Sequence, residues 1–72
     1  MLTLLNLCSL AQTSGDIIVN ATNMSTMDLR TLASSMKSGK LIIKNAEVLD
    51  PLDANSIALA NPGKVTFDFT NL

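Results

Sequence analysis

Apolar residues return along this 72-residue chain in three runs that follow one another at a constant interval. Each run comes after a glycine and a charged residue, and the glycines at 15, 39 and 63 are 24 residues apart. Every run carries an apolar residue at its first, third and eighth positions. Alternation of this kind predicts β-strands. We expect strands over residues 17–22, 41–46 and 65–69.

The stretch 1–13 predicts a helix, because four apolar side chains return there at helical spacing. Its other faces carry Leu2, Leu5 and Leu10, so the helix is apolar nearly all round. A helix of this kind is normally covered on more than one side. The four residues of the expected buried face are Leu4, Leu7, Cys8 and Ala11.

Two further helices are predicted between the strands. Ser25 is a good N-cap for the first of them, and Asp50 followed by Pro51 is a typical start for the second. Ser38-Gly39 and Asn61-Pro62-Gly63 should end these helices. Their expected buried stripes are Leu29, Leu32, Ala33 and Met36 in the first and Ala54, Ile57 and Ala58 in the second.

The predicted order is α-β-α-β-α-β, an α/β chain in which consecutive strands are parallel with right-handed crossovers. Equal spacing favours a small solenoid of 24-residue β/α repeats, with helices on one side of three parallel strands. A flavodoxin-like fragment with helices on both faces is the alternative. We interpret residues 1–72 as one domain that opens with a strandless half repeat, and a piece of a longer array is also possible. Its parts are a half repeat 1–16, repeats 17–40 and 41–64, and a terminal strand 65–72.

The repeat resembles the leucine-rich repeat in its length, its alternation of strand and helix, and its short apolar strand core. That family places an asparagine after the strand core. Here Asn23 and Asn71 fall one position later, and Glu47 takes that place in the middle repeat. The resemblance is therefore one of architecture, and it implies a solenoid that binds other proteins.

Composition excludes several function classes. The chain has one cysteine and no histidine, so an intramolecular disulfide is impossible and we predict neither a metal site nor a cofactor. The net charge is −1 and the basic residues do not cluster, so we expect no nucleic-acid partner. No apolar run has the length of a membrane span. A lone Cys8 on an apolar helix face is expected to be buried, and it favours a reducing, cytoplasmic compartment.

Catalytic chemistry has no clear carriers in this sequence. Cys8 has no histidine to activate it. Asp50 and Asp53 lie together, but helix capping explains both. We therefore predict no catalytic residues. The rival hypothesis is a ligand-binding or enzymatic domain with its site at the carboxyl ends of the strands. That site would comprise Thr22, Asn23, Asn45, Glu47, Thr70 and Asn71.

The leading hypothesis is a non-enzymatic protein-interaction or self-assembly module. A chain of this size has marginal stability, and oligomerisation is one way to increase it. The outer sheet face is expected to carry a partly apolar row beside a polar row of Asn20, Lys44 and Asp68. We predict a homo-oligomer, most simply a two-fold dimer, or binding to another protein. The candidate interface residues are Leu2, Leu5, Ile18, Ile42 and Thr66.

Overall fold

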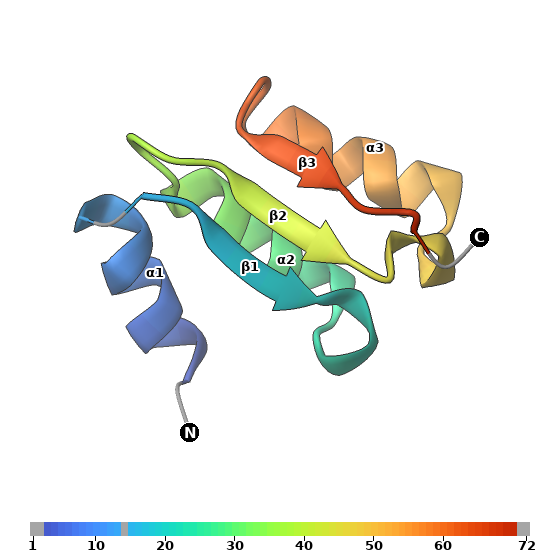
Figure 1. Cartoon of the computed structure of the whole chain (residues 1–72), viewed down its shortest axis with the longest axis horizontal. Helices are drawn as coiled ribbons and strands as arrows, with labels where there is room; N and C mark the ends of the chain where they lie inside the picture. Colours follow the sequence, from blue (N-terminus) through green and yellow to red (C-terminus); the bar gives the residue numbers. More distant parts are fainter. Residues whose placement is uncertain (1–2, 14, 71–72) are drawn as a thin grey trace.

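The chain alternates helices and strands in the predicted order (Figure 1). The computed structural model describes residues 3–13 and 15–70. Within them lie three α-helices of ten residues, two short 3-10 helices and one open sheet of three parallel strands. The elements are α1 (Leu4–Thr13), β1 (Ile17–Asn20), η1 (Ala21–Asn23), α2 (Thr26–Ser35), β2 (Leu41–Lys44), η2 (Ala46–Val48), α3 (Pro51–Ala60) and β3 (Val65–Phe67).

The sheet has the strand order β1-β2-β3, which follows the sequence. Both strand pairs have the register that the glycine spacing predicts, since Ile17 pairs with Leu41 and Leu41 pairs with Val65. The strands are shorter than expected. The first two end at Asn20 and Lys44, two residues earlier than predicted. Helix η1 begins at Ala21, and η2 begins at Ala46 after the single residue Asn45.

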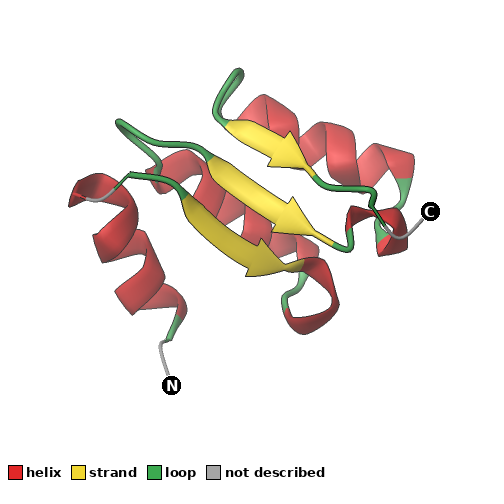
Figure 2. Ribbon diagram, in the orientation of Figure 1, coloured by secondary structure: helices red, strands yellow, loops and turns green. Residues whose placement is uncertain are grey.

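Helices α2 and α3 cover one face of the sheet, and α1 continues this helical layer beside α2. Helix α2 packs between α1 and α3, and α2 and α3 lie behind the strands in Figure 2. Leu41 and Ile43 of β2 point into this layer and are fully buried, whereas Lys44 is exposed on the other face. This arrangement differs from the flavodoxin-like alternative, because a second helical layer is missing from the described residues.

The core is concentrated in the middle of the molecule. All four residues of the predicted α2 stripe are buried, and so is Ile57 of α3. In α1 only Ala11 is fully buried. Cys8 was expected to be buried but is half-buried, because α1 packs against a neighbouring helix on one side only. The half-buried residues that pack against the core from α1 are Leu4, Leu7 and Cys8.

The helix starts agree with the predicted caps, with one difference in geometry. The Ser25 hydroxyl accepts a hydrogen bond from the Asp28 backbone N–H at 3.2 Å. Asp50 precedes Pro51 as predicted, but its side chain makes no capping hydrogen bond. The first helix begins at Leu4 rather than at residue 1. Its cap is Thr3, which exchanges two side-chain-to-backbone hydrogen bonds with Asn6 in a capping-box arrangement.

A single inserted residue explains why the strands repeat every 24 residues while Ser25 and Asp50 are 25 apart. Strand β1 runs directly into η1, but Asn45 stands between β2 and η2. Its φ and ψ of 56° and 38° are left-handed, a conformation that asparagine tolerates better than most residues. The loop after α3, residues 61–64, is one residue shorter than the loop 36–40 after α2, and this restores the strand register.

Two of the regularly spaced glycines are needed for different reasons. Gly39 is buried against the chain 24 residues earlier, where a Cβ would overlap the backbone carbonyl of Gly15. Gly63 has open space around it but a φ of +84°, which favours glycine. The constant glycine spacing therefore has no single structural cause.

Candidate interaction surfaces

Three of the five predicted interface residues form one row across the open face of the sheet. Ile18 pairs with Ile42, and Ile42 pairs with Thr66. Ile18 is 61% exposed, Ile42 is half-buried and Thr66 is exposed. Leu5 is 79% exposed but lies on α1, outside this row. The fifth candidate, Leu2, lies outside the described residues.

The polar row beside it is built as predicted and ties β3 to β2. The Lys44 Nζ lies 3.4 Å from the Asp68 Oδ2. The backbone of Asp68 also bonds to both sides of the β2 end, donating to the Ile43 carbonyl and accepting from the Ala46 N–H. Hydrogen bonds from the Thr70 side chain and backbone, and to a lesser extent the Lys44 ammonium, hold the pKa of Asp68 below its ordinary value. This row therefore stabilises the sheet.

The carboxyl ends of the strands hold polar groups that are mostly engaged in local turns. The Asn20 side chain accepts hydrogen bonds from the Thr22 backbone N–H and from its hydroxyl. The Asp68 carboxylate accepts one from the Thr70 N–H. The Glu47 Oε1 atom is buried and has no hydrogen-bond partner among the described residues. Asn71 of the rival site lies outside them.

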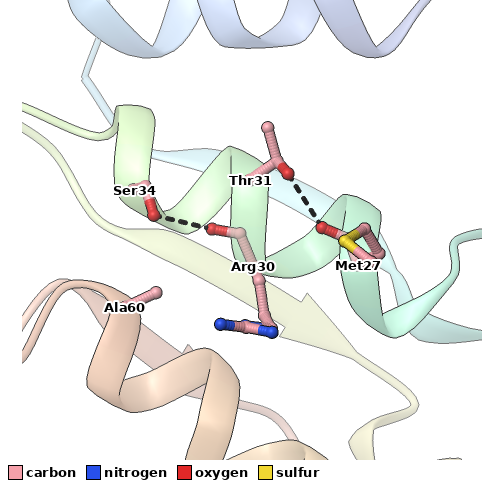
Figure 3. Close-up of a pocket in the computed structure, with 5 residues that line it drawn as sticks. All are labelled: Met27, Arg30, Thr31, Ser34 and Ala60. Atoms are coloured by element: carbon pink, nitrogen blue, oxygen red, sulfur yellow. Dashed lines mark hydrogen bonds between the residues drawn. The ribbon is translucent and has the colours of Figure 1, made fainter.

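A shallow, open hollow of about 250 Å³ lies in the helical layer, between α2 and α3 (Figure 3). The Arg30 side chain points from α2 toward α3, where Ala60 lines the opposite wall. The hydroxyls of Thr31 and Ser34 donate to carbonyls of their own helix at 2.9 and 3.0 Å. The hollow combines one cation with bonded hydroxyls, so it offers no acid or base for catalysis.

Equivalent apolar positions of the three helices differ in exposure, and the sequence pattern did not predict this difference. Leu10, Leu32 and Ile57 occupy the seventh position of their helices. The last two are fully buried, but Leu10 is 43% exposed. This equivalence is visible in the sequence when the three helices are aligned on the residues that precede them, which are Thr3, Ser25 and Asp50, instead of on the glycines.

A further apolar set lies on the outer side of the helices, away from the sheet. Leu52 and Leu59 are seven residues apart on one face of α3, and both are largely exposed. Met27 has the same place in α2 that Leu52 has in α3, and it is also exposed. Single exposed apolar residues are normal on a protein surface, so this set by itself does not indicate a binding site.

Comparison with models of known families, with curated proteins and with solved structures found no match. Within residues 3–13 and 15–70, no helix is long and apolar enough to cross a membrane. The same residues contain no group of three or more His, Cys, Asp and Glu side chains that could hold a metal ion.

Proposed function

We propose that this chain is a non-enzymatic, self-associating repeat module, built as a small leucine-rich-repeat-like solenoid. The constant strand register supports the repeat interpretation, because both strand pairs match residues 24 apart. Equivalent strand positions also share a direction: first and third positions face the helices and second positions face outward. Repeat modules of this kind mostly act by binding other proteins.

The observation that carries this proposal is the uneven coverage of equivalent positions. Leu41 and Ile43 of β2 are fully buried, but the matching Ile17 and Val19 of β1 are only half-buried. The matching residues of β3 are half-buried as well. In a solenoid each unit buries its core against its neighbours, and among the described residues β1 and β3 each have a strand on one side only. Association with a second subunit is the simplest way to cover them.

Three surfaces are available for that association: helix α1 with Leu5, the open sheet face with Ile18, Ile42 and Thr66, and the two sheet edges. An edge strand presents backbone N–H and C=O groups that can pair with another chain. The open face contributes Ile18, which is exposed. Positions on a solvated sheet face are usually polar, so an exposed isoleucine there favours a contact surface.

Sedimentation velocity of the 72-residue chain across the micromolar range tests the proposal. We expect a species larger than the monomer whose fraction rises with concentration. A monomer throughout that range would overturn self-association. Ile18→Asp and Ile42→Asp should abolish the larger species if the sheet face is the interface, and Ser34→Asp on the outer side of α2 is the matched control. An oligomer that survives both substitutions assigns the interface to α1 or to the edges.

A further inference from the structure

The helices carry a row of exposed apolar side chains across the outer face of their layer. The second residues of α1, α2 and α3 are Leu5, Met27 and Leu52, which are 79%, 68% and 81% exposed. The three helices lie side by side and run in the same direction (Figure 1), so these residues lie at the same end of the layer. Together they form an apolar stripe that crosses all three helices, which isolated exposed residues do not.

Helix α2 carries opposite charges on its two flanks, beside the middle of this row. The Arg30 side chain points toward α3, and it forms no ion pair among the described residues (Figure 3). Thr31 points toward α1, and Asp28 lies one turn before Thr31 on that side of the helix. Asp28 is half-buried and also forms no ion pair within residues 3–13 and 15–70. Both charges can therefore pair with a second chain.

The helical layer offers the larger of the two faces of the molecule. Neighbouring helices lie about 9 Å apart and neighbouring strands about 4.8 Å apart, so the helical face is about twice as wide as the sheet face. The two longer dimensions of the molecule are 31 and 27 Å, and the layers are stacked along the shortest one (Figure 1). A face of these dimensions offers on the order of 800 Å² to a partner, which is what each side of a standard interface buries.

We propose that two copies of this chain associate through their helical layers, about a two-fold axis that lies over α2 and parallel to it. Because the row residues share one helix position, this axis places Leu5 over Leu52 of the second copy and Met27 over the second Met27. It also exchanges the two flanks of α2, which brings Arg30 of each copy beside Asp28 of the other. This inference rests on the proposed self-association and extends its first candidate surface, α1 with Leu5, across α2 and α3. The interface is isologous, so it closes as a dimer.

The direction of the axis follows from what the outer helices carry. An axis along α2 places α1 of one copy against α3 of the other. Helix α1 contains no charged residue, so Asp50 and Asp53 at the start of α3 meet no like charge there. An axis across the helices would instead place the apolar row against the polar residues Gln12 and Ser34 near the other helix ends.

An exchange of charges tests this geometry. Arg30→Asp and Asp28→Arg each place like charges at both ion pairs, so either variant alone should raise the dissociation constant of the dimer at least about tenfold at low salt. Mixed in equal amounts, the two variants have opposite charges at both places and should form a 1:1 dimer. Sedimentation velocity measures association, and far-ultraviolet circular dichroism checks folding. The matched control is Lys37→Asp, the same charge change on an exposed residue beyond the end of α2, which should dimerise as the unmodified chain does.

Met27 provides a second measurement that does not depend on the folding of Asp28→Arg. Because Met27 is 68% exposed, Met27→Glu should fold normally, but it places two carboxylates at the axis and should leave the chain monomeric. Ser34→Asp, the control for the sheet face, lies on the same helical face and should also weaken the dimer. Ile18→Asp, on the sheet face, should leave the dimer intact.

The outcomes separate this inference from the proposed function. If the unmodified chain self-associates and Met27→Glu does not change its association, the helical-face geometry is wrong and self-association stands. If the unmodified chain is monomeric, both fail. If the two charge variants associate no better in the mixture than alone, the two-fold axis along α2 is wrong.

Discussion

Strand β2 with helix α2, at the centre of the molecule, and strand β3 with helix α3, at one edge of the sheet, have similar patterns of apolar residues but different coverage. Leu41 and Ile43 are fully buried in β2, and their partners Val65 and Phe67 are half-buried in β3. The difference arises from neighbours, since β2 has a strand on each side and β3 has one. The number of neighbouring strands, more than the residue type, decides how much an apolar side chain of the sheet contributes to stability.

This difference makes the molecule's stability depend on its centre. Burial contributes roughly 25 cal/mol per Å² of apolar surface, so fully buried positions contribute most. A domain of this size has a free energy of unfolding of only a few kcal/mol. Side chains of β3 and α3 should therefore contribute less than those of β2 and α2, and substitutions at equivalent positions should have unequal effects.

The largest contrast is expected between Leu32→Ala and Leu10→Ala. The fully buried Leu32 leaves a cavity when truncated, which should lower the free energy of unfolding by about 3 kcal/mol. Leu10 is already 43% exposed, so its truncation should cost about 1 kcal/mol or less. Urea unfolding at concentrations below any assembly measures both. Equal losses would show that α1 and α2 are equally covered in solution.

The loops before β2 and β3 provide the next contrast. Gly39→Ala should cost about 2 kcal/mol, because the new Cβ meets the backbone of Gly15 and Asp16 and the two loops must separate. Gly63→Ala has open space and should cost about 1 kcal/mol, from its left-handed φ alone. Thermal unfolding of the two variants tests the order. A larger loss for Gly63→Ala would mean that the contact between the first two loops is dispensable.

The regular part of this fold could be predicted from sequence because it depends on local periodicity and a constant interval. Alternation located all three strands, and the 24-residue interval gave their register. Ser25 was a recognisable cap because a hydroxyl before an apolar helix stripe has a local function. Strand ends were less predictable, since Ala21 continues the apolar alternation of Ile17 and Val19 yet begins a 3-10 helix.

The candidate surfaces could be predicted only where the register alone defines them. Ile18, Ile42 and Thr66 share a row in any parallel sheet with a 24-residue interval, so their alignment followed from sequence. The exposure of Leu10 did not, because the sequence pattern around it is the same as that around Leu32. The two differ in their neighbours: among the described residues, α1 packs chiefly against α2. Local sequence does not encode which neighbours a helix has.

The capping residues of α2 and α3 should show a smaller difference in their contribution to the free energy of unfolding. Ser25→Ala removes the hydrogen bond that the hydroxyl accepts from the Asp28 N–H and should cost about 1 kcal/mol. Asp50→Ala removes no capping hydrogen bond, so only its favourable charge at the start of α3 is lost, about 0.5 kcal/mol. Chemical denaturation of both variants is the measurement. A larger loss for Asp50→Ala would indicate that its side chain caps α3 in solution.

The smallest effect on stability is expected from the polar row that ties β3 to β2. The pKa of Asp68 is lowered in the folded chain, chiefly by hydrogen bonds from Thr70. The folded state therefore binds this proton less readily than the unfolded state, and the stabilisation is present above the ordinary value of 3.8 and is lost as the pH falls through the folded pKa. Asp68→Asn should lower the melting temperature slightly at neutral pH and leave it nearly unchanged in acid. Lys44→Met should keep most of this pH dependence, because the Lys44 charge is the lesser cause; its loss in that variant would show that the ion pair, rather than the Thr70 hydrogen bonds, holds β3 against β2.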